Sequence, residues 1–142
     1  MNLEKVFKNK KVIVTGHTGF KGSWLTLWLT EIGANVLGVS KDIPTIPSHY
    51  ELLGLGKKVK SKKIDIQNLK EIKKIIKTFK PDFIFHLAAQ SIVRKSYSST
   101  IETWKTNLMG TVNILESLKE NKKETINLII TSDKFYKNIE TK

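Results

Sequence analysis

The sequence contains no cysteine, three histidines and only three prolines in 142 residues. Without cysteine the protein has neither disulfides nor thiolate metal sites, and three scattered histidines do not form the closely spaced set that binds zinc. No apolar run approaches the roughly 20 residues that span a bilayer, and residues 1–5 carry no apolar signal segment. These absences argue against an exported or membrane protein and predict a cytoplasmic one with no metal and no membrane partner.

Arginine and acidic residues are also scarce beside lysine. The formal net charge is +12, and the 25 basic residues are 24 lysines and one arginine, Arg94. A nucleic-acid site usually gathers arginine and aromatic residues into a stripe, whereas these lysines are spread along the chain. Four lysines between residues 70 and 77 lie at helical spacing opposite apolar residues, which indicates a solvated helix face. We expect no nucleic-acid partner and interpret residues 57–63 as a lysine-biased surface, with nonspecific attraction of polyanions as the alternative.

Strand and helix patterns alternate from the beginning of the chain to its end. Short apolar, β-branched runs predict buried strands, and longer apolar stretches, some of them amphipathic, predict helices between them. The expected strands are residues 11–14, 35–39, 59–64, 83–87 and 126–130. The expected helices are residues 23–32, 68–79 and 103–119, with a loop at 40–49 and a brief helical turn at 50–53. This order predicts an α/β fold with a Rossmann-type doubly wound parallel sheet of about five strands.

A glycine loop lies between the first expected strand and the first expected helix. Its sequence is Gly16-His17-Thr18-Gly19-Phe20-Lys21-Gly22. In such a loop the first glycine allows a tight turn, the second lets the backbone approach a pyrophosphate, and the third lets the helix pack closely. Free amides and the dipole at the start of the helix then hold the anion. The alternative is a glycine-rich turn without a ligand, but the strand and helix on either side favour a dinucleotide site.

The choice between NAD and NADP depends on the end of the second strand, where Asp or Glu binds the ribose 2′-hydroxyl. Here Ser40 occupies that position, followed by Lys41 and Asp42. Asp42 could reach the ribose, whereas Lys41 could favour a 2′-phosphate. We expect NAD and keep NADP as the open alternative.

Four further segments resemble the extended short-chain dehydrogenase/reductases, the NAD-dependent epimerase/dehydratase group. They are Asp65-Ile66, His86-Leu87-Ala88-Ala89-Gln90, Thr106-Asn107-Leu108-Met109-Gly110-Thr111 and Thr131-Ser132-Asp133-Lys134. Within that group, the glycine loop continuing into Ser23-Trp24, together with Ala-Ala-Gln and Thr-Ser-Asp-Lys, is similar to the CDP-glucose 4,6-dehydratase family. The resemblance extends from about residue 8 to about residue 140. It reaches only the first part of an enzyme that is usually more than twice this long.

The resemblance implies a set of cofactor and substrate contacts at the carboxyl ends of the strands. The glycine loop would bind the pyrophosphate, residues 65 and 66 would flank the adenine, and residues 88 and 89 would line the nicotinamide half. The implied cofactor residues are Gly16, His17, Thr18, Gly19, Phe20, Lys21, Gly22, Ser40, Asp65, Ile66, Leu87, Ala88 and Ala89. The implied substrate residues are Gln90 and Arg94.

The implied reaction is an internal redox cycle that converts CDP-glucose to CDP-4-keto-6-deoxyglucose. Hydride leaves sugar C4 for NAD, the resulting ketone acidifies the C5 proton, the C6 hydroxyl departs, and hydride returns to C6. Ser132 would hydrogen-bond the 4-hydroxyl, Asp133 would act as general acid and Lys134 as base. Asn107 would hold the active-site architecture through backbone and water contacts. The implied partners are the nucleotide sugar and, in the full-length enzyme, a second copy of the chain.

Taken without the resemblance, several residues have plainer roles. Asp133 after a strand is a turn residue, and His86 is a core histidine satisfied by the backbone. Arg94 is as readily a surface residue as an anion ligand in the loop that follows the fourth strand. Trp24 and Trp28 are expected to pack in the core.

A catalytic pair that the extended short-chain dehydrogenase/reductases use, Tyr-x-x-x-Lys, is missing. In that family the tyrosine takes the hydroxyl proton and the lysine lowers its pKa. The residues four positions after Tyr50, Tyr97 and Tyr136 are Gly54, Ile101 and Glu140. We therefore expect residues 1–142 to be an incomplete Rossmann domain, inactive alone, without the C-terminal sugar-nucleotide-binding domain, from either a fragment or a truncated gene. The alternatives are a non-catalytic dinucleotide-binding remnant and another extended-family epimerase or reductase.

Overall fold

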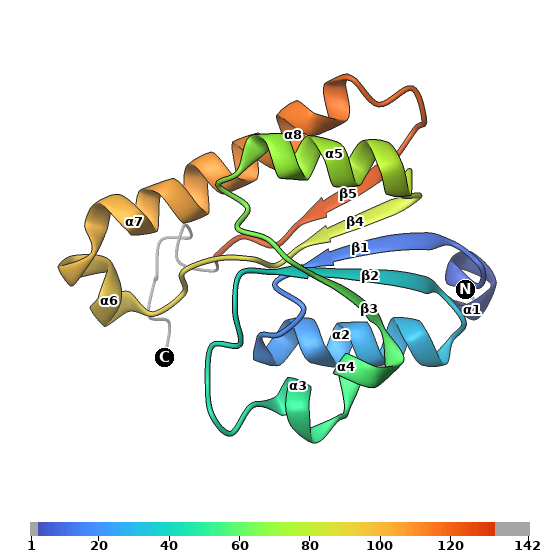
Figure 1. Cartoon of the computed structure of the whole chain (residues 1–142), viewed down its shortest axis with the longest axis horizontal. Coiled ribbons are helices and arrows are strands. Elements are labelled where there is room, and N and C mark those ends of the chain that lie inside the picture. Colours follow the sequence, from blue (N-terminus) through green and yellow to red (C-terminus); the bar gives the residue numbers. More distant parts are fainter. Residues whose placement is uncertain (1–2, 133–142) are drawn as a thin grey trace, which may run out of the picture.

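Five parallel strands form one sheet in the order β3-β2-β1-β4-β5 (Figure 1). This computed structural model describes residues 3–132. The strands are β1 (Lys11–Thr15), β2 (Asn35–Ser40), β3 (Lys60–Lys63), β4 (Phe83–His86) and β5 (Ile126–Ile129). The strand order reverses between β1 and β4, so the connections leaving these two strands diverge and open a crevice at their carboxyl ends. The predicted doubly wound parallel sheet is confirmed.

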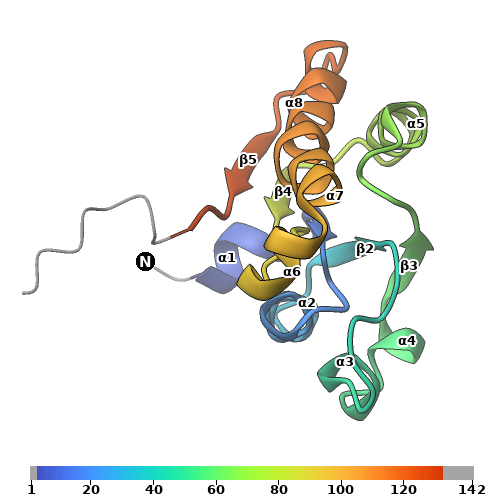
Figure 2. The same ribbon diagram turned by 90° about the vertical axis from the view of Figure 1, so that its left-hand side faces the viewer.

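Helices cover both faces of the sheet (Figures 1 and 2). One face carries α1 (Leu3–Phe7), α2 (Phe20–Glu31), α3 (His49–Leu52) and α4 (Leu55–Lys58). The opposite face carries α5 (Leu69–Phe79) and α8 (Gly110–Lys119). The chain reaches α8 from β4 through α6 (Val93–Ser98), α7 (Thr100–Trp104) and the π-helical turn η1 (Lys105–Met109).

Local sequence signals account for the ends of the predicted helices. Asn68 caps α5 because its side-chain oxygen accepts a hydrogen bond from the backbone N–H of Glu71. The helix ends at Phe79, and its C-cap residue Lys80 has a left-handed φ of 52° and precedes Pro81. Helix α2 is followed by Gly33 with a φ of 84°, the C′ glycine that the sequence predicts.

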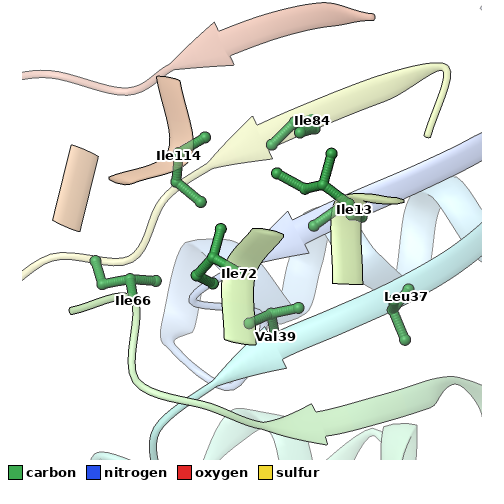
Figure 3. Close-up of a cluster of buried hydrophobic side chains, with 8 residues drawn as sticks. Ile13, Leu37, Val39, Ile66, Ile72, Ile84 and Ile114 are labelled. Atoms are coloured by element: carbon green, nitrogen blue, oxygen red, sulfur yellow. The ribbon is translucent and has the colours of Figure 1, made fainter. Parts of the chain in front are cut away.

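Each face of the sheet has its own apolar cluster. Figure 3 shows the cluster under α5 and α8, where side chains of both helices meet those of β1, β2 and β4. Its buried members are Ile13, Leu37, Val39, Ile66, Ile72, Ile76, Ile84 and Ile114. The second cluster lies under α1 and α2 and contains Phe7, Val12, Val14, Leu29 and Val36. Successive residues of β1 point to opposite faces, so both faces need apolar residues and the strand reads as a continuous apolar run.

Three short helices, α1, α4 and α6, are not predicted by the sequence. Helices of four to six residues contain too few turns for an apolar periodicity to show. Helix α6 includes Arg94, so the expectation that Arg94 lies in a loop is wrong. The helix expected at residues 103–119 begins at Thr100 and passes through the π turn η1 before α8.

The prediction that Trp24 and Trp28 pack in the core is also wrong. They are 51% and 40% exposed. Trp24 contacts His49, with 4.5 Å between ring centroids, and Trp28 meets Phe7 of α1 edge-on at 6.0 Å. Both tryptophans therefore join α2 to short neighbouring segments, and the pattern of α2 alone does not distinguish this from packing on the sheet.

The lysine-rich segments lie on the surface. All four residues of β3 are exposed at the edge of the sheet, and charged side chains on an edge strand disfavour pairing with another chain. On α5, Ile72 and Ile76 are buried while Lys70, Lys74 and Lys77 are exposed, which confirms the predicted solvated helix face. Among residues 3–132, no helix is both long and apolar enough to cross a membrane.

Gly110, the first residue of α8, lies against Ile66 in the loop after β3. A Cβ at this position would overlap the side chain of Ile66, which is buried in the core. We expect Gly110→Ala to lower the free energy of unfolding by about 2 kcal/mol, measured by urea denaturation, because overpacking displaces buried side chains.

Gly56→Ala is the matched control for this prediction. Gly56 lies in α4, and the nearest heavy atom to an added Cβ is 3.5 Å away. This substitution should leave stability unchanged or raise it by up to about 1 kcal/mol. Equal unfolding midpoints for the two variants would contradict the close contact at Gly110.

Candidate functional site

The glycine loop joins β1 to α2 at the carboxyl edge of the sheet. Gly16 has a φ of +72°, and a Cβ there would lie 2.8 Å from the backbone nitrogen of Ala88 in the segment after β4. A Cβ at Gly22 would overlap the Gly16 carbonyl. The absence of these two side chains therefore lets α2 start directly against the ends of β1 and β4.

This cradle fits a pyrophosphate. The first amides of a helix have no acceptor within the helix, and at the start of α2 no side chain of the cap residue Gly19 occupies them. Together with the helix dipole they favour a bound anion. Lys21, in the first turn of α2, is exposed and adds a positive charge at the same end.

His17 is buried beneath the loop and joins three strands. Its Nδ1 shares a hydrogen bond of 2.8 Å with Ser40 Oγ, and its Nε2 shares one of 3.0 Å with Ser61 Oγ. The ring meets Tyr50 edge-on at 5.3 Å, and a Cβ at Gly38 would overlap it. Burial lowers the pKa of His17, so the ring is neutral near pH 7. The buried His17 side chain thus connects the glycine loop to the ends of β2 and β3.

A cavity of about 340 Å³ opens beside this network at the carboxyl ends of β2 and β3. The polar side chains that line it beyond the glycine loop include Ser40, Lys41, Asp42, Ser61, Lys62 and Lys63. In a Rossmann fold this position receives the adenosine half of the dinucleotide. A smaller cavity of about 250 Å³ lies between α5 and the end of α8, on the opposite edge of the sheet from the glycine loop.

Lys41, which lines the larger cavity, forms ion pairs with two carboxylates. Lys41 Nζ lies 2.9 Å from Asp65 Oδ2 and 3.5 Å from Glu102 Oε1 of α7. Burial raises the pKa of Asp65, but the hydrogen bond from Gln67 N and the pairing with Lys41 outweigh burial and lower it overall. The hydrogen bond to Asp65 raises the pKa of Lys41. Both groups are therefore charged at neutral pH.

Asn107 fastens the loop after β4 to the π turn. Its Oδ1 accepts a hydrogen bond of 2.7 Å from Gln90 N, and its Nδ2 donates one of 2.9 Å to Gln90 O. The Gln90 side chain donates to Ile92 O and to Thr103 Oγ1. Both contacts of Asn107 with Gln90 are to backbone atoms, which agrees with the backbone contacts that the resemblance implies for Asn107. π turns are frequent at functional sites because they redirect side chains in this way.

His86 connects the ends of β1 and β4 to α8. Its Nδ1 shares a hydrogen bond of 2.7 Å with Thr15 Oγ1, and its Nε2 shares one of 3.0 Å with Thr111 Oγ1. Thr15 Oγ1 also accepts from the backbone N–H groups of Leu87 and Ala88. The ring is thus satisfied by hydroxyl groups, and the expectation of backbone partners is wrong. Burial lowers the pKa of His86 to about 4.

The fold brings most of the expected cofactor residues together. The glycine loop, Ser40, Asp65 and residues 87–89 all lie at the carboxyl ends of β1 to β4. Ile66 belongs to the core, where it is 4% exposed. Gln90 and Asn107 are neighbours, whereas Arg94 is exposed on α6 and Ser132 is exposed after β5. Asp133 and Lys134 lie outside the described residues.

Sequence reasoning missed the Lys41–Asp65 pair and the contribution of Tyr50 and Ser61. No local sequence pattern predicts these contacts, because they join residues from separate strands and loops. Within residues 3–132, no group of three or more His, Asp or Glu side chains could hold a metal ion.

Comparison with known proteins identifies the family to which the sequence is similar. A protein-family model described as GDP-mannose 4,6 dehydratase matches residues 13–141. CDP-glucose 4,6-dehydratase of Salmonella typhimurium is 51% identical over 136 residues, which cover 94% of this chain and 37% of that protein. An epimerase structure from Methanothermobacter thermautotrophicus superposes with a TM-score of 0.82 at 26% identity, covering 100% of this chain and 41% of that one.

A Thermus thermophilus UDP-glucose 4-epimerase in complex with NAD superposes with a TM-score of 0.69 at 26% identity. The match covers 80% of this chain and 35% of that one. The chain therefore spans well under half the length of the relatives and structures that it matches.

The buried neutral His86 makes stability depend on pH. In the unfolded chain its pKa is near 6.5, and in the folded protein it is about 4. Between these values the unfolded state binds a proton that the folded state does not, so stability falls as the pH drops from about 6.5 towards 4. At pH 5 the loss from His86 is about 2 kcal/mol relative to pH 7.5.

His86→Gln should remove most of this loss, leaving a smaller slope that includes the contribution of His17. Urea denaturation at pH 7.5, 6 and 5 measures the effect, and His49→Gln is the control for loss of a histidine outside the sheet. A His86→Gln variant that loses as much stability at pH 5 as the unsubstituted protein would show that His86 is not held neutral.

Proposed function

Since this chain belongs to the GDP-mannose 4,6-dehydratase family, we propose that it forms the cofactor-binding part of a nucleotide-sugar 4,6-dehydratase. The observation that carries the proposal is the close packing at the start of α2. A Cβ at Gly16 or Gly22 would overlap backbone atoms there, so both positions require glycine. Residues 1–142 form, in this proposal, an incomplete dinucleotide-binding domain. The sugar-nucleotide-binding domain and the Tyr-x-x-x-Lys pair belong to the part of such an enzyme that this chain does not span.

The proposed substrate is CDP-glucose and the proposed product is CDP-4-keto-6-deoxyglucose. The 51% identity to a CDP-glucose 4,6-dehydratase supports this choice over other nucleotide sugars. The proposed redox cofactor is NAD, which supplies a hydride acceptor at C4 of the sugar and a hydride donor at C6. A homodimer is the proposed assembly of the complete enzyme.

The residues of this chain would bind and orient both ligands. The α2 amides hold the pyrophosphate, and the segment at residues 87–89 lines the nicotinamide half beside Gly16. Gln90 shapes this segment, because its amide is bonded to Ile92 and Thr103, while the exposed Arg94 offers a guanidinium to the substrate phosphates.

The proton transfers would fall to the segment after β5. Ser132 hydrogen-bonds the sugar 4-hydroxyl, Asp133 protonates the departing C6 hydroxyl, and Lys134 removes the C5 proton. Asp133 and Lys134 lie outside the described residues, so the support for their roles is the resemblance of Thr-Ser-Asp-Lys to the family.

An epimerase of the same group is the second candidate, because epimerase structures superpose on the whole of this fold. The two reactions begin with the same oxidation at C4 and differ in whether water is eliminated. Competition between CDP-glucose and UDP- or GDP-sugars for the complete enzyme separates them, since an epimerase should prefer a different base.

Direct binding tests the cofactor site. The 142-residue chain should bind NADH saturably, seen as enhanced nicotinamide fluorescence, and Gly22→Ala should weaken binding by at least about tenfold because the new Cβ displaces α2 from the Gly16 carbonyl. Gly56→Ala, outside the site, should bind as the unsubstituted chain does. No NADH binding by the unsubstituted chain would refute the proposed cofactor site.

The same preparation tests the dependence on the missing pair. Residues 1–142 supplied with NAD and CDP-glucose should give no 4-keto product above background, because no tyrosine is present to take the 4-hydroxyl proton with a lysine four residues later. Measurable turnover would overturn the assignment of that role to Tyr-x-x-x-Lys.

A further inference from the structure

A closed cycle of hydrogen bonds links the segment after β4 to η1 and α8, and the His86 side chain lies in the middle of it. His86 is 3% exposed, and both of its ring nitrogens have hydroxyl partners, Thr15 Oγ1 at 2.7 Å and Thr111 Oγ1 at 3.0 Å. The nitrogen that carries the proton decides the direction of both hydrogen bonds. The other hydrogen bonds of the two hydroxyl groups fix that direction at each end.

At the Thr15 end, the hydroxyl oxygen accepts from two backbone amides. Leu87 N and Ala88 N each lie 3.2 Å from Thr15 Oγ1, and the Leu87 amide is shared with the Thr15 carbonyl. A hydroxyl group has one proton and two lone pairs, so the proton of Thr15 is left for His86. The Thr15 hydroxyl therefore donates to His86 Nδ1, which carries no proton of its own.

The Thr111 end gives the same tautomer independently. Thr111 Oγ1 donates a hydrogen bond of 2.8 Å to the backbone carbonyl of Asn107 in η1. Because its one proton is used there, the oxygen of Thr111 accepts from His86, whose proton therefore lies on Nε2. Burial lowers the pKa of His86 to about 4, so the imidazole keeps this single proton at neutral pH.

Asn107 closes the cycle on the side away from β1. Its side chain accepts from Gln90 N at 2.7 Å and donates to Gln90 O at 2.9 Å. Residues 87–90 are thus held at one end by the Thr15 hydroxyl and at the other end by Asn107, and the neutral His86 side chain connects the two. A doubly protonated imidazole would donate to Thr15 and occupy a lone pair that a backbone amide now uses.

We propose that His86, in the tautomer with its proton on Nε2, is a positioning residue that aligns residues 87–90 with the nicotinamide half of the dinucleotide. It acts through Thr15 and Thr111, which bind its two nitrogens. The amides of α2 and the cavity at the ends of β2 and β3 belong to other elements, so we expect the nicotinamide half alone to lose affinity when the cycle is broken. The inference rests on the proposed function, because it concerns the same dinucleotide site.

Nitrogen NMR tests the tautomer directly. In the ¹⁵N-labelled chain, long-range spectra distinguish a protonated imidazole nitrogen from a bare one, and comparison with His86→Gln assigns the signals of His86. We expect Nε2 to be protonated and Nδ1 to be bare at pH 7.5. A proton on Nδ1, or averaged signals from exchange of the proton between the two nitrogens, would overturn the proposal.

Thr111 tests the positioning without changing the buried histidine. Thr111→Val removes the hydroxyl and keeps the shape of the side chain, so the Nε2 proton loses its acceptor, whereas Thr111→Ser keeps the hydroxyl. Thr111→Val should raise the Kd for NADH by about fivefold and the Kd for ADP-ribose, which lacks the nicotinamide, by less than about twofold. Thr111→Ser should bind both ligands as the unsubstituted chain does. Nicotinamide fluorescence measures NADH binding, and calorimetry measures ADP-ribose binding.

The combination with His86→Leu tests whether the two residues act along one path. His86→Leu should weaken NADH binding at least as much as Thr111→Val does, and the double variant should bind no more weakly than His86→Leu alone. Losses that multiply in the double variant would contradict a shared path. Should His86→Leu fail to fold, the two Thr111 variants decide the proposal.

Thr125→Val is the matched control for the loss of a hydroxyl. Thr125 Oγ1 also donates to a backbone carbonyl, that of Pro81, but it precedes β5 at the amino edge of the sheet. This variant should leave both Kd values unchanged. Equal weakening of NADH and ADP-ribose by Thr111→Val, or no weakening of either, would overturn this inference alone. Binding of neither ligand by the unsubstituted chain would refute the proposed function and this inference together.

Discussion

The close approach of the Gly16 backbone to that of Ala88 is the contact on which the candidate site depends. It joins the ends of β1 and β4, the two parallel strands between which the strand order reverses, and it is possible only because residue 16 has no side chain. Thr15 reinforces the junction, because its hydroxyl accepts hydrogen bonds from the Leu87 and Ala88 amides and binds His86. The crevice of a doubly wound sheet is thereby narrowed to a cradle of backbone groups, which suits an anion.

The same junction positions the helical segment that crosses above it. His86 extends the contact to Thr111 of α8, and Asn107 in the π turn holds the loop after β4 through Gln90. Asn113 donates to the carbonyls of Ile66 and Gln67 in the loop after β3. One helical segment is thus bonded to the loops that follow two strands. Asn107 and Thr111 are four residues apart, so both lie on the side of this helical segment that faces the sheet edge.

The polar side chains of the site fall into two groups, buried neutral ones and more exposed charged ones. Buried neutral groups, the His17 and Ser40 pair above all, set the shape of the loop and carry no net charge. Charged groups nearer the surface, Lys41 and Asp65 among them, form an ion pair beside the cavity at the carboxyl ends of β2 and β3.

The amino-acid sequence by itself determined the strands, the longer helices, the glycine loop and the family, because periodicity, helix caps and loop spacing are properties of neighbouring residues. Only the tertiary structure decided that Trp24 is exposed, that His86 is bonded to two hydroxyls, and that Lys41 pairs with Asp65. These contacts join residues far apart along the chain, and strand register and the path of a π turn choose their partners. Register is a property of the assembled sheet, so no local pattern in the chain encodes that Lys63 lies beside Ser40.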